Sequence, residues 1–173
     1  MRRPIIAVLV AAALVFGLVW LGQFGRNWLN QRQHYTVKFT ELRCVSPPGM
    51  DRATFLGQVQ YYGSLPDQIN LLDAGLVNRL QAAFQLHEWV ELVEGVSLRG
   101  PDGPTVRLVI RTPALAVAGR VVDRHGVLLP AGTSVEGLPV YPDPAPPPTG
   151  PAGTPWGDPK VEAAARKAGG GKE

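Results

Sequence analysis

The longest apolar run of the chain extends from Ile5 to Phe24 and follows Arg2 and Arg3. A helix of about twenty residues at 1.5 Å per residue spans about 30 Å, the thickness of the hydrocarbon layer of a bilayer. Trp28 follows the run, where an aromatic ring favours the membrane interface. The pattern predicts one transmembrane helix. A cleaved signal peptide is one alternative, but signal peptides have a shorter apolar core followed by a small-residue cleavage site, and no such site follows this run. A buried helix of a soluble domain is the other alternative.

Two stretches of the following region carry the period of an amphipathic helix. The first begins at Asp51, a residue type that caps helices, and its apolar positions run from Phe55 to Tyr62. The second begins at Asp73 and keeps its apolar residues on one stripe as far as Phe84. We therefore expect two successive helices.

Three further stretches favour strands. Residues 37–45 are rich in β-branched and aromatic residues, although their alternation is imperfect. Residues 96–111 alternate apolar and polar positions on either side of a Gly-Pro-Asp-Gly-Pro turn, which predicts a hairpin. Residues 118–129 repeat this arrangement around Asp-Arg-His-Gly and predict a second, shorter hairpin.

The predicted order is strand, helix, helix, strand, strand and a partial extra hairpin. Helices that lie together between strands indicate an α+β domain rather than a doubly wound one. The C-terminal part is dominated by Pro, Gly and Ala, a composition typical of disordered or polyproline II segments. The expected division is a tail at 1–4, a transmembrane helix at 5–24, a linker at 25–34, a folded domain at 35–115, a further β region at 116–141, and a disordered tail at 142–173 with a short helix at 160–168.

The net charge of +3 on 173 residues is weak, and Lys and Arg form no block of five or six. This distribution predicts a solvated, mildly basic surface and no nucleic-acid partner.

The residue types used for catalysis and metal binding are sparse and scattered. Cys44 is the one cysteine and has no metal-ligand spacing around it. His34, His87 and His125 form no metal motif, and Asp123 beside His125 is interpreted as a turn residue rather than half of a catalytic pair. We expect no enzyme activity, no cofactor, no metal and no small-molecule substrate.

Three residues are the candidates for partner binding: Trp89, Arg111 and Pro113. A Trp at a helix-to-strand junction is a core residue or a partner anchor. Proline cannot donate to a sheet, so Pro113 directs the chain out of its hairpin. Strand edges near this corner are candidates for accepting a partner's strand.

The region from Tyr35 to Tyr141 contains several short motifs that follow one another in the same order as in a known family. Arg111-x-Pro113 closes a hairpin and Val122-Asp123-x-x-Gly126 makes the next turn; the other motifs are Asn70-Leu71-Leu72-Asp73, Trp89-Val90 and Leu138-Pro139. Behind a single N-terminal span, this order resembles the FtsQ/DivIB family of bacterial division proteins.

The resemblance implies a small POTRA-like domain with the order β-α-α-β-β, followed by the start of a β domain. It also implies a single-pass protein of the bacterial inner membrane, with a cytoplasmic N-terminus and an extracytoplasmic, periplasmic domain at the division septum. Arg and Lys lie on both sides of the apolar run, so charge alone does not decide this orientation. The expected function is therefore a non-enzymatic scaffold of the divisome.

The family's β domain provides the main docking edge for an FtsB/FtsL pair. Here a Pro-rich stretch begins at Pro142, so the resemblance implies a truncated β domain and leaves binding of FtsB/FtsL-like partners open. Ile110 also stands where the family usually carries an acidic residue. A POTRA-like adaptor in secretion or outer-envelope assembly is the alternative function.

Overall fold

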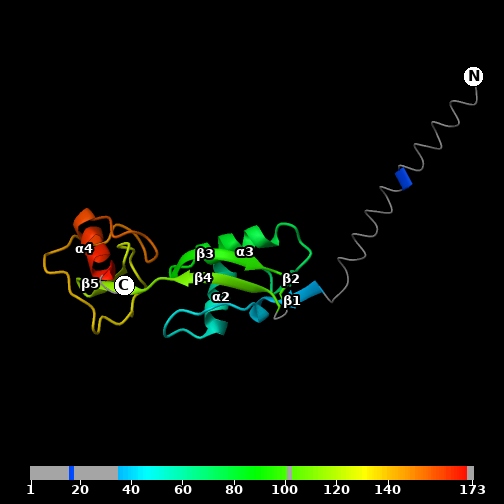
Figure 1. The fold of residues 1–173 in the computed structure, drawn as a ribbon, viewed down its shortest axis with the longest axis horizontal. Coiled ribbons are helices and arrows are strands. Elements are labelled where there is room, and N and C mark those ends of the chain that lie inside the picture. Colours follow the sequence, from blue (N-terminus) through cyan, green and yellow to red (C-terminus); the bar gives the residue numbers. More distant parts are fainter. Residues whose placement is uncertain (1–15, 18–34, 101–102, 171–173) are drawn as a thin grey trace, which may run out of the picture.

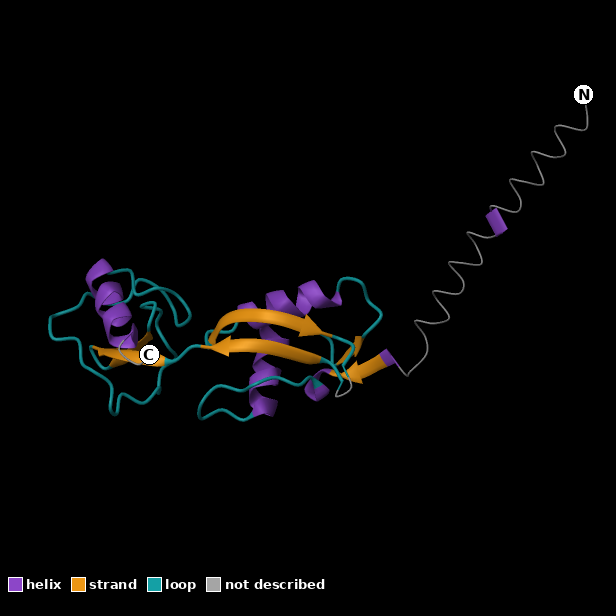
Figure 2. Cartoon of the chain, in the orientation of Figure 1, coloured by secondary structure: helices purple, strands orange, loops and turns teal. Residues whose placement is uncertain are grey.

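The computed structural model describes residues 16–17, 35–100 and 103–170. Two units follow one another along the chain and lie end to end (Figures 1 and 2). The first unit contains β1 (Thr36–Lys38), the 3-10 turn η2 (Phe39–Glu41), α2 (Arg52–Tyr62), β2 (Gln68–Asn70), α3 (Leu76–Gln85), β3 (Val90–Ser97) and β4 (Thr105–Ile110). The second contains β5 (Pro113–Val117), β6 (Arg120–Asp123) and α4 (Pro159–Gly169).

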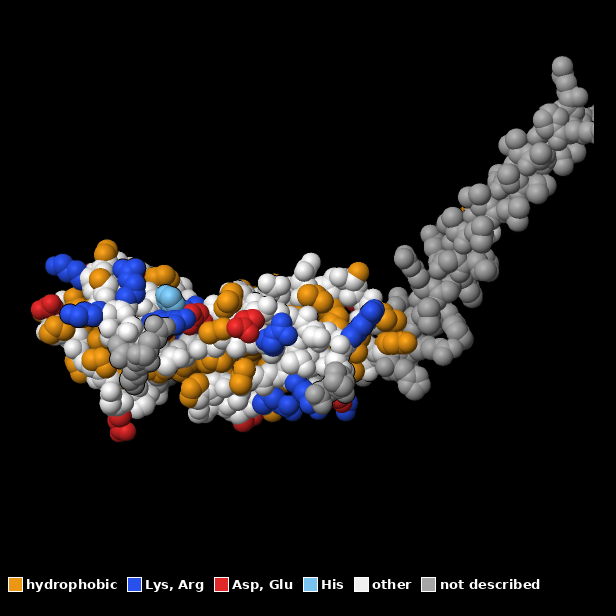
Figure 3. Space-filling view, in the orientation of Figure 1, with side chains coloured by type: hydrophobic (Ala, Val, Ile, Leu, Met, Phe, Trp, Pro, Cys, Tyr) orange, Lys and Arg blue, Asp and Glu red, His pale blue; other side chains and the backbone are white. Residues whose placement is uncertain are grey.

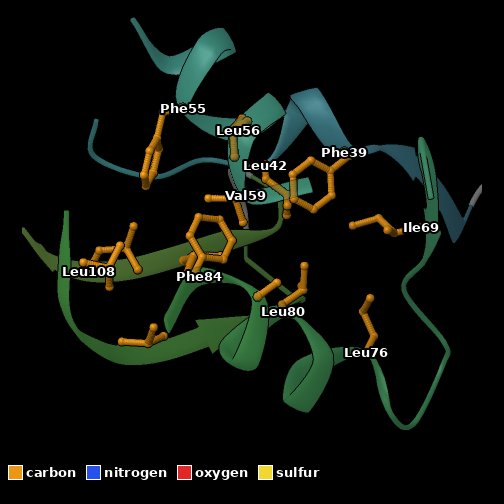
Figure 4. Close-up of a cluster of buried hydrophobic side chains, with 14 residues drawn as sticks. Phe39, Leu42, Phe55, Leu56, Val59, Ile69, Leu76, Leu80, Phe84 and Leu108 are labelled. Atoms are coloured by element: carbon orange, nitrogen blue, oxygen red, sulfur yellow. The ribbon is translucent and has the colours of Figure 1, made fainter. Parts of the chain in front are cut away.

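The core of the first unit lies between its two helices and the antiparallel hairpin of β3 and β4 (Figure 4). Phe55 from α2 and Phe84 from α3 are fully buried, with ring centroids 5.9 Å apart. Val93 and Leu108 lie opposite each other on the hairpin and close the core from the sheet side. Burial of an aromatic side chain of this size contributes about 1.5–3 kcal/mol, so this cluster is the main source of stability for the unit.

Local sequence explains where the two helices begin and how closely they pack. Asp51 caps α2 because its carboxylate accepts hydrogen bonds from the Thr54 amide at 2.9 Å and the Thr54 hydroxyl at 2.7 Å. The hydroxyl bond, followed by the amide bond, holds the pKa of Asp51 below its usual range. At the other end of α2, a side chain at Gly63 would lie 2.3 Å from Ala83 Cβ, so glycine is required where α2 meets α3.

The remaining strands of the first unit are short. β1 and β2 pair antiparallel over three residues, with Val37 opposite Ile69. Beyond η2, Arg43 lies parallel to the start of β4 and accepts a hydrogen bond from the Val106 amide at 2.8 Å. The chain from residue 43 to Met50 therefore starts along the side of β4 that is turned away from β3.

The second unit is built on the antiparallel pair β5 and β6. Val140 pairs with Ala116 on the free side of β5, and Leu128 pairs with Val122 on the free side of β6. Helix α4 packs Val161 and Ala165 into a cluster with Trp156, which is 1% exposed. In the structure, the stretch after residue 142, for which we predict disorder, is thus held against the second hairpin by Trp156 and α4.

The expected architecture, a transmembrane helix followed by a β-α-α-β-β POTRA-like domain and a partial hairpin, is wrong. The described chain is a small α+β domain with three α-helices and three two-stranded sheets. One reason is β2, which intervenes between α2 and α3 and pairs with β1. The other is α4, which packs onto the second hairpin and gives that hairpin a core of its own.

Among the described residues, no helix is both long enough and apolar enough to cross a bilayer. The predicted span at 5–24, apart from Phe16 and Gly17, lies outside the described residues, as do the predicted tail at 1–4 and the whole of the predicted linker at 25–34.

His87 follows α3 and is an uncharged histidine of the core. Its side chain is 1% exposed, its Nε2 lies 2.9 Å from Gln58 Oε1, and its Nδ1 accepts a hydrogen bond from the Trp89 amide at 3.3 Å. The Phe55 ring packs against it at 4.7 Å. Burial lowers the pKa of His87 from 6.5 to about 4, so the folded protein binds fewer protons than the unfolded chain between these pH values.

Stability is therefore expected to fall as the pH decreases from about 6.5 to about 4, with His87 responsible for a loss of about 3 kcal/mol. Above pH 6.5 this contribution is fully present. Urea unfolding followed at several pH values from 7.5 to 4.5 measures the slope. The His87→Gln variant removes the titrating ring, and an equally steep slope in that variant would assign the acid sensitivity to other groups.

Candidate protein-interaction site

Trp89, Arg111 and Pro113 come together at the junction between the two units. The Trp89 carbonyl accepts a hydrogen bond from the Arg111 amide at 2.9 Å, just before β3 begins and just after β4 ends. Two residues later, Pro113 opens β5 and lies opposite Asp123 in β6. The corner at 111–113 thus carries the chain from the sheet of the first unit into the sheet of the second.

The Trp89 side chain forms the apolar part of this junction. It is 6% exposed and clusters with Val121 and Leu129, both from the second unit. Met50 and Ile110 from the first unit pack against the same cluster. Trp89 is therefore covered by the protein's own second unit, and its role as a partner anchor stays a prediction.

An ion pair forms the polar part of the junction. Arg111 Nη1 donates to Asp123 Oδ2 at 2.7 Å, and the two side chains are 14% and 0% exposed. Asp123 Oδ1 also accepts the amides of His125 at 2.8 Å and Val127 at 2.9 Å. A carboxylate with these partners can remain charged while buried, because each oxygen has a donor. Arg111 and Asp123, which belong to two separate motifs of the resemblance, thus form an ion pair that joins the two units.

A second, more exposed ion cluster crosses the junction beside the first. Glu91 Oε1 in β3 lies 2.8 Å from Arg124 Nη2 and 3.1 Å from His125 Nε2. Burial raises the pKa of Glu91, but the hydrogen bond and charge of Arg124, and then those of His125, more than offset this and lower the pKa overall. Because the side chains of Arg124 and His125 are more than half exposed, solvent screens the cluster and its contribution to stability is small.

A groove of about 340 Å³ opens at the same junction. Its walls come from Glu91 and Val109 of the first unit and from Ala114, Leu138 and Ala168 of the second. The walls are mainly apolar, and the charged side chains Glu91 and Arg124 pair with each other. The groove is therefore an apolar surface whose two charged side chains are engaged with each other.

Strand β3 begins at this junction, runs away from it and forms the outer edge of its sheet. Val96 lies opposite Val106, whose amide donates to Arg43 on the side away from β3. In an antiparallel pair, both residues at such a position point their backbone groups away from each other. Val96 therefore presents its N–H and C=O along the outer edge of β3.

The side chains and irregularities of β3 shape this edge. Leu92 is 51% exposed and Glu94 is exposed, although both lie within the longest strand of the described chain. The register shifts between Val90 and Leu92 and again between Val93 and Gly95. Bulges and charges of this kind limit indiscriminate strand pairing, so the edge favours a partner with a matching pattern.

The two outer segments of the second sheet differ from β3 because prolines interrupt them. In the segment beside β5, Val140 is followed two residues later by Pro142, and the segment paired with Val127 contains Pro155. Proline has no amide hydrogen to donate to an added strand. Of these three edges, β3 is therefore the one best suited to strand addition.

The described chain brings together no set of residues that resembles a catalytic or metal centre. No group of three or more His, Cys, Asp or Glu side chains within it is placed to hold a metal ion. Cys44 is half-buried, and burial, partly opposed by the charge of Arg52, raises the pKa of its thiol to about 11. Such a thiol stays protonated near neutral pH and is a poor nucleophile. His34 lies outside the described residues, and His125 belongs to the ion cluster.

Basic and acidic side chains occur on both units of the face shown in Figure 3. Comparison of the chain with protein-family models and with curated protein sequences finds no match.

Sequence reasoning found the corner at 111–113 but missed the pairing of Arg111 with Asp123. The signal that was available is the polarity of Asp123, which follows the apolar Val121 and Val122 in a strand that the second hairpin predicts. A charged residue that ends a buried strand needs a partner of opposite charge. Arg111 is such a residue, since it ends the second strand of the first predicted hairpin.

Proposed function

We propose that this chain is a non-enzymatic scaffold of bacterial cell division that binds other division proteins by adding a partner's strand to the outer edge of β3. It acts at the inner membrane, with its folded domain on the extracytoplasmic side at the septum. The observation that carries the binding mode is the open edge of β3, which presents the backbone of Val96 and the side chains of Leu92 and Glu94.

The attribution to cell division rests on the motif resemblance, and the apolar run at 5–24 supports a membrane location. Backbone hydrogen bonds give strand addition its affinity, and side chains at alternate positions give it specificity. A partner strand with an apolar residue beside Leu92 and a Lys or Arg beside Glu94 suits this edge, because opposite charges stabilise cross-strand neighbours.

Depletion of the protein in the cells that produce it is expected to give filamentous cells without septa. A copy carrying Leu92→Asp is expected to fail to restore division, since it places an unpaired charge where the partner's strand would lie. Leu86→Asp is the matched control, because Leu86 is 65% exposed at the end of α3, outside β3. Microscopy of cell length with each copy gives the result.

Normal septation after depletion would refute the role in division. Restoration by the Leu92→Asp copy, at the same protein level as the control, would refute the β3 edge as the binding site. Crosslinked partners that belong to secretion or outer-envelope assembly, in cells that divide normally, would favour the adaptor function instead.

A further inference from the structure

A proline-rich segment crosses the surface of the second unit between the β5 side of its sheet and Trp156. Residues 144–148 read Pro-Ala-Pro-Pro-Pro and have no regular secondary structure. Each of these residues is a proline or directly precedes one. Proline fixes φ near −65° and excludes the helical region for the residue before it. These five residues, which we name the proline strap, therefore favour the polyproline II conformation.

The burial of the strap repeats every three residues. Ala145 and Pro148 are half-buried, whereas Pro144 and Pro147 are both exposed, as is Pro146. Polyproline II has three residues per turn, so residues i and i+3 share one edge. Ala145 and Pro148 therefore form the inner edge against the protein, and Pro144 and Pro147 form an edge that faces solvent.

Hydrogen bonds to Trp156 hold the strap in place. The Trp156 indole Nε1 donates to the Pro146 carbonyl at 3.0 Å, and the Trp156 carbonyl accepts the Thr149 amide at 3.1 Å. Ala145 also packs against the cluster that contains Trp156. The strap is thus fixed at its middle and at its end, so little conformational freedom remains to be lost on binding.

We infer that the exposed edge of the proline strap is a second interaction surface, which binds a protein domain whose groove is lined by Trp and Tyr side chains. Grooves of this kind take up Pro-x-x-Pro segments in the polyproline II conformation. Pro144 and Pro147 have this spacing and point outward together. The surface lies on the second unit and does not depend on the β3 edge.

Charges near the start of the strap specify the partner further. Asp143 is exposed and directly precedes Pro144. Burial, and then the charges of Asp143 and Asp158, raise the pKa of Tyr141, which places both carboxylates near the same end of the strap. The partner groove is therefore expected to carry Lys or Arg beside its aromatic side chains.

The test is site-specific photocrosslinking of the full chain in the cells that produce it. A benzoylphenylalanine at Pro146, the exposed proline between the two binding prolines, is expected to give one discrete adduct. Peptide mapping is expected to place the crosslink beside Trp or Tyr residues of the partner. In the Pro144→Ala/Pro147→Ala variant we expect the adduct to decrease about tenfold, since two anchoring side chains are removed.

Pro142→Ala/Pro151→Ala is the matched control, because both prolines are exposed and lie outside the strap. It is expected to leave the adduct within about twofold of the parent, a change well below one anchor's contribution. No adduct above that of a crosslinker at Gln81 on α3, an adduct mapped to a surface without aromatic residues, or an equal loss in both double variants would overturn the inference. A crosslinker at Leu92 reports on the β3 edge separately, so failure of either proposal can be recognised by itself.

Discussion

Replacement of Arg111 by Met is expected to lower the free energy of unfolding by about 3–5 kcal/mol. The variant leaves the carboxylate of Asp123 buried, with 0% exposure, and without its charged partner. Removal of one member of a buried pair has this large effect because the remaining charge is no longer compensated. Urea unfolding at pH 7, followed by tryptophan fluorescence, measures the difference.

Arg124→Met is the control for the loss of a positive charge at the same junction, since Arg124 is 56% exposed and its pair with Glu91 is screened by solvent. We expect it to cost less than about 1 kcal/mol. In the double variant Arg111→Met/Asp123→Asn the buried charge is absent, while the Asn oxygen can still accept the amides of His125 and Val127, so stability should partly return. A cost below about 1 kcal/mol for Arg111→Met would show that the two units do not depend on this pair.

Trp156→Ala is expected to destabilise the protein by a similar amount, about 3–5 kcal/mol, because it leaves a large cavity at the centre of the second unit. Trp156 is 1% exposed and packs with Val161 of α4 and Leu128 beside β6. Its loss should therefore detach α4 as well. Amide hydrogen exchange along residues 159–169, together with urea unfolding, measures both effects.

Trp156→Phe separates packing from hydrogen bonding, because it keeps an aromatic ring but loses the indole donor to Pro146. We expect a smaller cost of about 1–2 kcal/mol and faster exchange limited to the amide of Thr149 and its neighbours. Protection of α4 that is unchanged in Trp156→Ala would contradict the central place of this side chain.

The sequence pattern correctly predicted the elements whose contacts are made mainly between residues close together in the sequence. The helical stripe after Asp73 corresponds to α3, and the alternation on both sides of residues 100–104 corresponds to the hairpin of β3 and β4. Asp73 itself lies just before the helix, where its Oδ1 accepts the Gly75 amide at 2.8 Å. The short strand β2 escaped prediction because three residues are too few to show alternation.

The second unit was harder to predict because its order comes from contacts between distant residues. Val127 pairs with Pro155, and the Trp156 amide donates to the Gly126 carbonyl at 2.9 Å. No period in a Pro- and Gly-rich segment indicates such pairs. One Trp in a segment of this composition was the available signal, since a large aromatic residue is most stable when buried. The candidate residues Trp89, Arg111 and Pro113 were found as a corner, but which side chains they contact depends on the same long-range pairing.

The prolines at both margins of the second sheet affect how copies of the protein associate when their local concentration is high. Edge-to-edge stacking of the second sheets of neighbouring copies is disfavoured, because Pro142 and Pro155 remove donors from the rows that such stacking would use. Crowding many copies into a narrow zone of the cell therefore carries little risk of fibril growth through this unit.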